Sequence, residues 1–308
     1  MKDRVSVIII AKNEPRIDYT LQSLLHQTVK PYEVIVVVDD VDDISAKIAE
    51  KYIGKLSIKI VVNDMPGYGG ARRKGVEEAS GDIIAFISAD CIADRKWIES
   101  IVSIFSTASV MVQAGKTINI NSFESYRKVN PRYAKTPKTK ILRFASAQNF
   151  AFKKELVNVV GNFDPWFSEG GEDLDFCIRL RKKGFNIYYN PNAIVYHFKH
   201  RLKLQRAWRD GRSRAKAFIK HGKVLLSDAL TCFFHTLSLF SASLLSILGF
   251  FNYAMLALIP SLLHRLYRMI TNVLYGENLL ESCIEQFITY ISHISFTLTA
   301  ISLSIKRL

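Results

Sequence analysis

The stretch VSVIIIAKNE, residues 5–14, decides the fold. Its first seven residues, Val5 to Ala11, are apolar apart from Ser6, and branched side chains dominate them. A strand that is apolar on both faces is typical of the centre of a parallel sheet with helices on both sides. The run is too short for a signal-peptide core or a membrane span. We therefore expect a buried central strand.

The residues after this strand alternate between helical and strand patterns. Such alternation predicts βαβ units and a parallel sheet, so the expected fold class is α/β. Further strands are predicted over residues 34–38, 58–62 and 82–87, and helices over residues 19–27, 44–52 and 67–79.

Acidic residues follow the carboxyl ends of these strands. Asp39 and Asp40 follow the second strand, and Asp90 follows the fourth. Open α/β sheets bind ligands in the crevice at this edge, so we expect a site there. Aspartate is also a good helix N-cap, which is the interpretation that we favour for Asp43 and Asp94.

The net charge of +14 is concentrated in two stretches. Residues 127–143 carry seven Lys or Arg and no acid, and residues 199–223 carry ten against a single aspartate. Such a balance points to a phosphorylated or anionic partner. No nucleic-acid-binding module accompanies the charge, so we expect no nucleic-acid partner. The four cysteines are scattered without CxxC spacing, which predicts reduced or buried thiols.

The composition changes after residue 200. Residues 224–263 contain one charged side chain, Asp228, and residues 286–305 contain none. Both lengths suit transmembrane helices, which need roughly 20 residues. We expect the first stretch to form a helical hairpin that turns near Asn252. An interfacial or buried helix is the alternative for the second stretch.

The basic stretch 199–223 mixes aromatic side chains with cations, as an amphipathic helix on an anionic membrane surface would. The positive-inside rule then places this face in the cytoplasm. We expect a multi-pass protein of the cell membrane whose first domain, which we expect to be the catalytic one, faces the cytoplasm. The expected organisation is an α/β domain at 1–198, the interfacial helix at 199–223 and a transmembrane region at 224–308.

Five motifs in order resemble those of family 2 glycosyltransferases. The resemblance implies a GT-A fold with a Rossmann-like mixed sheet, a nucleotide-diphosphate sugar donor, and inversion at the sugar. The motifs are VSVIIIAKNE (5–14), VVVDDVDD (36–43), ARRKG (71–75), GDIIAFISAD (81–90) and the segment 161–197.

The resemblance assigns a donor site to the acidic edge of the sheet. Asp40 would contact the nucleotide base, with a turn cap as the alternative. Arg72 would bind the diphosphate, because a guanidinium can donate two parallel hydrogen bonds to a phosphate group. Lys12 stands where many relatives have an aromatic residue. The remaining donor positions are Ile10, Glu14, Ser88, Ala89, Asp90 and Arg212.

The metal motif of the family, Asp-x-Asp, is Ser88-Ala89-Asp90 in this chain. Asp90 keeps the position of the metal ligand, whereas Ser88 replaces an acid that often contacts ribose. Oxygen ligands suit Mn²⁺ and Mg²⁺, either of which would neutralise the departing diphosphate. His197 matches a histidine that completes the metal shell in several relatives. A structural histidine is the alternative.

The segment from Gly161 to Gly184 is the most specific feature of the chain. Asp173 matches the catalytic base of the family, at a helix start where the dipole favours an ionised carboxylate. Glu172 would orient the acceptor. A plain helix cap is the alternative for Asp173. The other positions expected beside the acceptor are Trp166, Gly170 and Gly171.

Two further stretches are candidates for the acceptor. Residues 205–209, QRAWR, are close to the Q-x-x-R-W motif of cellulose-synthase-like members and make Gln205 and Trp208 acceptor candidates. Membrane anchoring is the alternative. The basic loop 127–143 would hold lipid phosphates or be a solvated surface loop.

The sequence therefore predicts a metal-dependent hexosyltransferase with a membrane-bound acceptor, such as a polyprenyl-phosphate-linked glycan, and membrane lipids as partners. GDP-mannose is the favoured donor on family grounds. One alternative is a small processive polysaccharide synthase. Another is a non-catalytic membrane protein that binds sugar, although the intact Gly-Gly-Glu-Asp segment at 170–173 argues against it.

Overall fold

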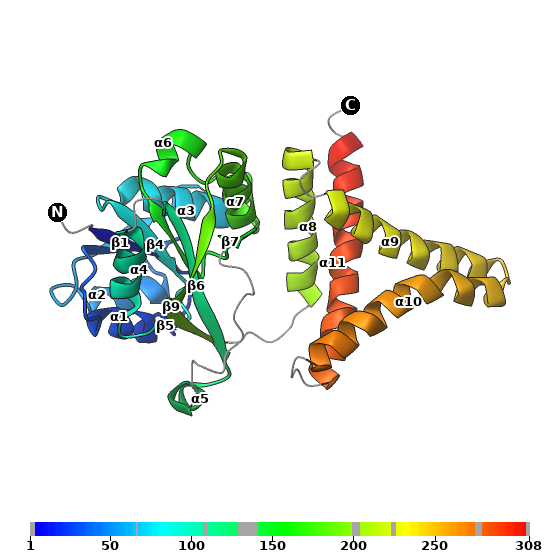
Figure 1. Ribbon diagram of the computed structural model, residues 1–308, viewed down its shortest axis with the longest axis horizontal. Coiled ribbons are helices and arrows are strands. Elements are labelled where there is room, and N and C mark those ends of the chain that lie inside the picture. The colour runs from blue at the N-terminus through cyan, green and yellow to red at the C-terminus, as the bar shows by residue number, and fades with distance from the viewer. Residues whose placement is uncertain are drawn as a thin grey trace. The chain divides into compact units, whose positions relative to one another are not determined.

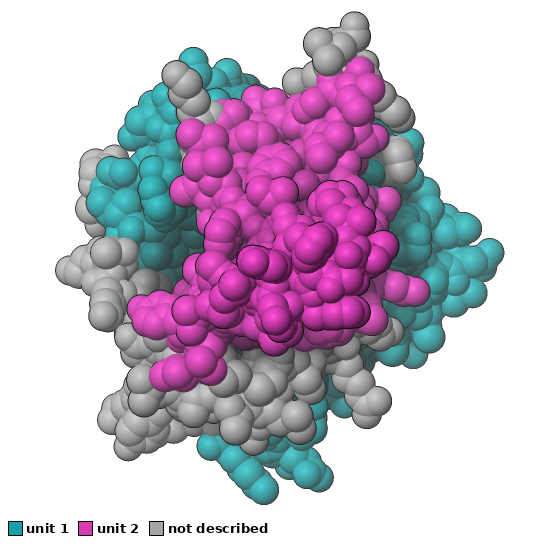
Figure 2. All heavy atoms as spheres, turned by 90° about the vertical axis from the view of Figure 1, so that its right-hand side faces the viewer, with its two compact units in different colours: residues 1–200 teal, residues 201–308 magenta. Residues whose placement is uncertain are grey.

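A computed structural model describes residues 4–65, 67–106, 110–128, 141–198, 204–222, 226–274 and 279–305. The chain forms two compact units, residues 1–200 and residues 201–308, which are coloured separately in Figure 2. The first unit is a sheet covered by helices, and the second is helical (Figure 1). The first unit therefore has the expected α/β class.

The sheet of the first unit is mixed, as predicted. Its strand order is β3-β2-β1-β4-β8-β6-β9-β5, with β7 paired to β9. The first four strands are parallel, whereas β8 is antiparallel to β4 and β6, and β5 is antiparallel to β9. The strands are β1 (Val5–Ile10), β2 (Glu33–Val38), β3 (Ile58–Val62), β4 (Ile83–Ile87), β5 (Cys91–Ala93), β6 (Val112–Ile120), β7 (Ile141–Leu142), β8 (Asn149–Lys153) and β9 (Ile187–Phe198).

Helices cover both faces of this sheet (Figure 1). Val7 and Ile9 of β1 face one layer and Ile8 faces the other, because side chains alternate along a strand. The first layer contains α1 (Ile17–Leu25), α2 (Ile44–Glu50) and α4 (Trp97–Phe105). The second contains α3 (Gly67–Glu78), α6 (Leu156–Val160) and α7 (Glu172–Lys182), while α5 (Phe123–Lys128) packs in a small separate cluster.

The predicted βαβ units are confirmed, with boundaries within two residues of those expected. Asp43 caps α2 by accepting a hydrogen bond from the Ser45 amide, as expected for a helix N-cap. The same expectation is wrong for Asp94, which accepts from the Lys96 amide in the turn before α4, because Lys96 is the N-cap of that helix and no side chain caps it. The cysteines of the described side chains are buried and free, as expected. Strand β5 was not predicted, because three residues carry no periodic pattern.

The second unit contains α8 (Leu204–His221), α9 (Leu226–Ile247), α10 (Phe251–Leu274) and α11 (Leu279–Ile305). The expected hairpin is formed by α9 and α10, and it turns at residues 248–250, just before Asn252. Within this unit α8 packs along α11, where a Cβ added at Gly211 would lie 2.1 Å from the carbonyl oxygen of Ser292. The basic helix is therefore held against α11 by a close backbone approach.

Two stretches of the second unit are long and apolar enough to cross a membrane. They are Ala229–Ile247 in α9 and Gln286–Ile305 in α11. The intervening helix, α10, runs past Arg265 and Arg268 to Leu274, so it is less apolar than either neighbour.

Candidate functional site

The loop after β1 is tied to the start of α2. Asn13 has a φ of 47°, a left-handed conformation that asparagine tolerates better than most residues. Its amide donates to Asp43 at 2.8 Å. Lys12 forms an exposed ion pair with Asp39, with Nζ 2.8 Å from Oδ2. The ends of β1 and β2 are therefore fixed to each other at the edge where a ligand is expected.

Glu14 contacts Arg16 in this loop. Its carboxylate accepts from the amide of Arg16 at 3.0 Å and from Nε and Nη2 at 2.7 and 2.6 Å. Held in this way, Nη2 of Arg16 lies 3.9 Å from Oδ2 of Asp90. Glu14, a predicted contact of the sugar donor, thus holds the guanidinium of Arg16 beside Asp90, the predicted metal ligand.

Asp90 and His197 lie together, although they are far apart in the sequence. Their side chains are buried, and Nε2 of His197 lies 3.4 Å from Oδ2 of Asp90. The cause is the antiparallel pairing of β5 with β9, in which Cys91 is opposite His197. Because Asp90 directly precedes β5, this register brings the carboxylate to the imidazole.

The imidazole of His197 is oriented by two amides. Nδ1 lies 3.3 Å from Oδ1 of Asn119, and Nε2 lies 3.3 Å from the side-chain nitrogen of Gln148. Because the Asn119 oxygen can only accept, Nδ1 donates to it, and the Gln148 amide donates to Nε2, which also lies 3.4 Å from Oδ2 of Asp90. A second-sphere partner of this kind fixes the tautomer that a metal ligand requires.

These residues fit a divalent cation. Among the described residues, Asp90, Cys91 and His197 bring one ligand atom each to within 4.8 Å of one another. A carboxylate oxygen and an imidazole nitrogen suit Mn²⁺. Burial raises the pKa of Cys91 well above its ordinary value, so that the thiol stays protonated and is a poor ligand.

The glycine-rich turn at the start of α3 packs against the segment 164–168. The amides of Tyr68 and Gly69 donate to the carbonyl oxygens of Ser168 and Phe167 at 3.0 and 3.1 Å. A Cβ added at Gly69 would lie 2.2 Å from the carbonyl oxygen of Asp164. Glycine is needed here because of this close approach.

The N-terminus of α7 carries the predicted base. Gly170 and Gly171 have φ values of 127° and 87°, which explains why glycines occupy these positions. The carboxylate of Asp173 accepts hydrogen bonds from the amides of Leu174 and Ala147 at 2.8 and 3.3 Å. Burial nevertheless raises the pKa of Asp173, an effect opposite to that of the helix dipole. A raised pKa makes a carboxylate a stronger base.

Arg72 of α3 is ion-paired with Glu172 of α7. Both side chains are largely buried, and Nε of Arg72 and Oε2 of Glu172 have no hydrogen-bond partner within the described part of the chain. Burial also raises the pKa of Glu172, and the charge of Arg72 opposes that shift. The predicted diphosphate-binding arginine therefore contacts the residue expected to orient the acceptor.

The segment 145–149 joins the Asp90–His197 pair to the predicted base. The Ala147 amide donates to Asp173, and the next side chain, Gln148, contacts His197. Neither Gln148 nor Asn119 was identified from the sequence, since an amide side chain alone carries no chemical signature. Arg16 was also missed, although its place two residues after Glu14 in a strand-end loop was a usable signal.

The other predicted residues lie in several places. Asp40 is exposed at the end of β2 and accepts from the Asp42 amide at 3.0 Å, so it does cap a turn. Trp166 is 38% exposed and stacks edge-on against Phe167. Ile10 ends β1, Ser88 and Ala89 follow β4, and Gln205, Trp208 and Arg212 lie on α8 of the second unit. Most of the basic loop, residues 129–140, lies outside the described residues.

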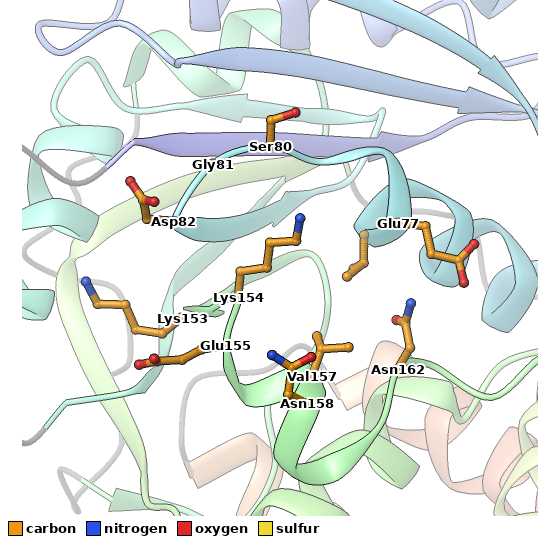
Figure 3. A pocket seen from close by; sticks show the side chains of 11 residues that line it. Glu77, Ser80, Gly81, Asp82, Lys153, Lys154, Glu155, Val157, Asn158 and Asn162 are labelled. Atoms are coloured by element: carbon orange, nitrogen blue, oxygen red, sulfur yellow. The ribbon is translucent and has the colours of Figure 1, made fainter.

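A cavity of about 640 Å³ lies beside the amino end of β4 (Figure 3). Gly81 and Asp82, just before β4, line it together with Lys153 and Lys154 at the end of β8. Ile83 of β4 is paired with Lys153, so this cavity is at the amino end of β4, whereas Asp90 follows its carboxyl end. The cavity is therefore separate from the cluster of Asp90, His197 and Asp173.

Comparisons with known proteins agree with this geometry. Residues 6–161 match the family described as "Glycosyl transferase family 2". The chain is 27% identical over 235 residues to chondroitin synthase of Pasteurella multocida, covering 63% of this chain and 24% of that protein. It is 25% identical over 215 residues to glucosyl-dolichyl phosphate glucuronosyltransferase of Haloferax volcanii, covering 63% and 69%. The chain thus spans only about a quarter of the length of the first of these relatives.

Solved structures share the fold. Mannosyltransferase PcManGT from Pyrobaculum calidifontis, in complex with GDP-Man and Mn²⁺, aligns with a TM-score of 0.63 at 16% identity, covering 96% of this chain and 88% of that one. A fragment of TarS from S. aureus in complex with UDP-GlcNAc aligns with a TM-score of 0.55 at 18% identity, covering 70% and 66%. Both alignments support the same mixed α/β architecture.

Proposed function

The chain belongs to glycosyl transferase family 2, and we propose that it transfers a hexose, with inversion, from a nucleotide-sugar donor to a lipid-linked acceptor at a membrane. The observation that carries this proposal is the placement of Gln148 and Ala147. These two consecutive residues contact His197 and Asp173, and so join a candidate cation site to a candidate base. In sugar transfer from a nucleotide-diphosphate sugar, a base would take the acceptor proton and a cation would neutralise the leaving diphosphate, and the two would act at one centre.

Asp90 and His197 are the residues that would hold a divalent cation. Such a cation would neutralise charge on the leaving diphosphate. Arg16 and Arg72 are two residues that would bind phosphate oxygens, because each presents a guanidinium beside a predicted site residue. Asn119 and Gln148 would keep the imidazole of His197 in position.

Asp173 would act as the base. In the transfer step an acceptor hydroxyl oxygen forms a bond to the anomeric carbon while the bond to the diphosphate oxygen breaks. The hydroxyl proton passes to the carboxylate of Asp173. The raised pKa of Asp173 favours this transfer, and the amides of Ala147 and Leu174 fix the direction of the carboxylate.

The second unit supports action at a membrane. It contains two helical stretches that are long and apolar enough to span one. Large apolar side chains of α9 and α10 are also exposed, and Ile247 is 82% exposed. Exposed apolar surface of this extent marks a membrane or protein contact. We therefore propose that this unit anchors the enzyme where a lipid-linked acceptor resides.

GDP-mannose is the donor that we propose. The alignment over 96% of the chain with a mannosyltransferase crystallised with GDP-Man and Mn²⁺ supports this choice. A relative in Haloferax volcanii named for a dolichyl phosphate substrate supports a lipid-linked acceptor.

A donor and acceptor panel tests the proposal. The purified chain would be incubated with Mn²⁺, one radiolabelled nucleotide sugar at a time, and either a short polyprenyl-phosphate-linked sugar or a soluble sugar. We expect label from GDP-mannose to enter the lipid extract. Label that enters only the soluble sugar would exclude the lipid-linked acceptor, and label from UDP sugars alone would exclude the proposed donor.

A further inference from the structure

A polar cluster lies between the helices of the second unit. Nδ1 of His235 in α9 lies 2.6 Å from the hydroxyl of Ser261 in α10, which also contacts the hydroxyl of Tyr290 in α11. Nη2 of Arg265 donates to Nδ1 of His293 at 2.8 Å, and its guanidinium lies 4.5 Å from the centre of the Tyr290 ring. The rings of His235 and His293 stack at 5.1 Å. The five side chains therefore form one group.

This group is buried but not satisfied. His235 and Arg265 are 0% and 7% exposed. Nε2 of His235 and Nε of Arg265 have no hydrogen-bond partner in the described part of the unit. A polar atom buried without a partner is costly, and an arginine among apolar helices is more so. The cluster therefore has unused binding capacity.

The unused atoms are donors. Arginine can only donate, so Nδ1 of His293 accepts and the Nε–H of Arg265 remains available. If Tyr290 donates to Ser261 and Ser261 donates to His235, then Nε2 of His235 carries the other hydrogen. Two donors and a fixed positive charge suit an oxyanion.

A metal ion does not suit this place. Arg265 would repel a cation. Among the described residues of this unit, no three His, Cys, Asp or Glu side chains bring ligand atoms within 4.8 Å of one another. Asp90, Cys91 and His197 of the first unit do so.

We propose that the cluster of His235, Arg265 and His293 binds a phosphate group, carried either by a lipid or by a soluble phosphate. The guanidinium of Arg265 supplies the charge, and the Nε–H groups of Arg265 and His235 supply the hydrogen bonds. This site goes beyond the proposed sugar transfer and does not depend on it, because binding requires neither nucleotide sugar nor the first-unit cluster.

Binding of three probes to the purified full chain in a neutral detergent tests this inference. Calorimetry without donor would compare farnesyl phosphate, farnesol and inorganic phosphate. We expect farnesyl phosphate to bind and farnesol not to bind. Binding of inorganic phosphate with equal affinity would assign the site to a soluble phosphate, whereas its absence would assign it to a lipid phosphate. Equal binding of farnesyl phosphate and farnesol would overturn the proposal.

Two arginines on the same helix provide the variant and its control. Arg265→Gln should weaken phosphate binding at least about tenfold, the loss expected for a charge-assisted hydrogen bond. Arg268→Gln removes the same charge from an exposed position three residues away and should leave binding within about twofold. Equal losses in the two variants would overturn the proposal.

Folding of each variant would be checked by circular dichroism. His235→Phe supplies a second test if Arg265→Gln does not fold, because it removes the imidazole donor while keeping an aromatic ring and leaves the arginine in place. Wild-type affinity for farnesyl phosphate in this variant would contradict the assigned site.

Discussion

Nε2 of His197 lies 3.4 Å from Oδ2 of Asp90, across the pairing of β5 with β9. The imidazole is held by Asn119 at Nδ1 and by Gln148 at Nε2, which keeps Nε2 on the side of the ring that faces Asp90. A carboxylate and an imidazole in this arrangement are the residues that would hold the divalent cation proposed above.

Removal of either ligand should weaken the binding of Mn²⁺ together with a nucleoside diphosphate. We expect the larger loss for Asp90→Ala, because it removes the charged ligand, and a smaller one for His197→Ala. Cys91→Ser is the matched control and should bind Mn²⁺ like the wild type, because burial keeps this thiol protonated. Calorimetric titration measures all three. Unchanged binding in His197→Ala would make this histidine structural.

Arg72→Met should move the acid limb of the pH–rate profile to higher pH. The positive charge of Arg72 lowers the pKa of Asp173, while burial raises it. Without that charge the pKa rises further, so the base stays protonated up to a higher pH and activity is lost earlier on acidification. Arg73→Met is the control, because Arg73 is exposed and paired with Glu77 on the same helix. If the acid limb of Arg72→Met stays at the wild-type pH, the charge of Arg72 does not control the pKa of Asp173.

Gly69→Ala should slow transfer by displacing the segment before α7. The added Cβ would meet the Asp164 carbonyl oxygen at 2.2 Å, so the segment 164–168 must shift. A displacement of about 1 Å near a reacting centre can cost roughly 100-fold in rate. Gly54→Ala is the control. Its φ of 82° makes alanine strained, but nothing lies within 4 Å, so stability should fall by about 1 kcal/mol with the turnover rate unchanged. Equal rates in the two variants would contradict this role.

Neutralising Arg206, Arg209 and Arg212 of α8 should reduce activity on a lipid-linked acceptor more than on a short soluble analogue. Each cation near an anionic bilayer contributes about 1 kcal/mol of attraction. The comparison uses liposomes with and without anionic lipid. Equal losses on both acceptors would indicate instead that α8 binds the donor. The neighbouring Arg201 and Lys203 lie outside the described residues.

Much of the first unit could be predicted from local pattern. The strand over Val5–Ile10 is apolar on both faces, and only a central parallel strand needs that composition. The resemblance to family 2 glycosyltransferases, rather than local pattern, suggests Asp90 and His197 as joint metal ligands, and their side chains do lie 3.4 Å apart. Their meeting depends on β5, a three-residue strand that has no signal of its own.

Contacts between distant segments could not be predicted in the same way. The pairing of Arg72 with Glu172 joins α3 to α7, and each residue alone resembled a ligand-binding side chain. The side-chain amide of Gln148 contacts His197, but an isolated glutamine in the sequence gives no indication of such a partner. The helix α10 continues past the apolar stretch 224–263 to Arg265, whose guanidinium contacts His293 and Tyr290 of α11, and no local pattern indicates these contacts.

The most direct test of the central claim is sugar transfer by Asp173→Asn, measured beside nucleotide binding by the same protein. Asparagine keeps the size of the side chain but cannot take up the proton of the acceptor hydroxyl. We predict a fall in transfer of about 10²–10⁴-fold, with the affinity for the nucleoside diphosphate and Mn²⁺ nearly unchanged. Transfer within about tenfold of the wild-type rate would show that Asp173 is not the base and would contradict the account.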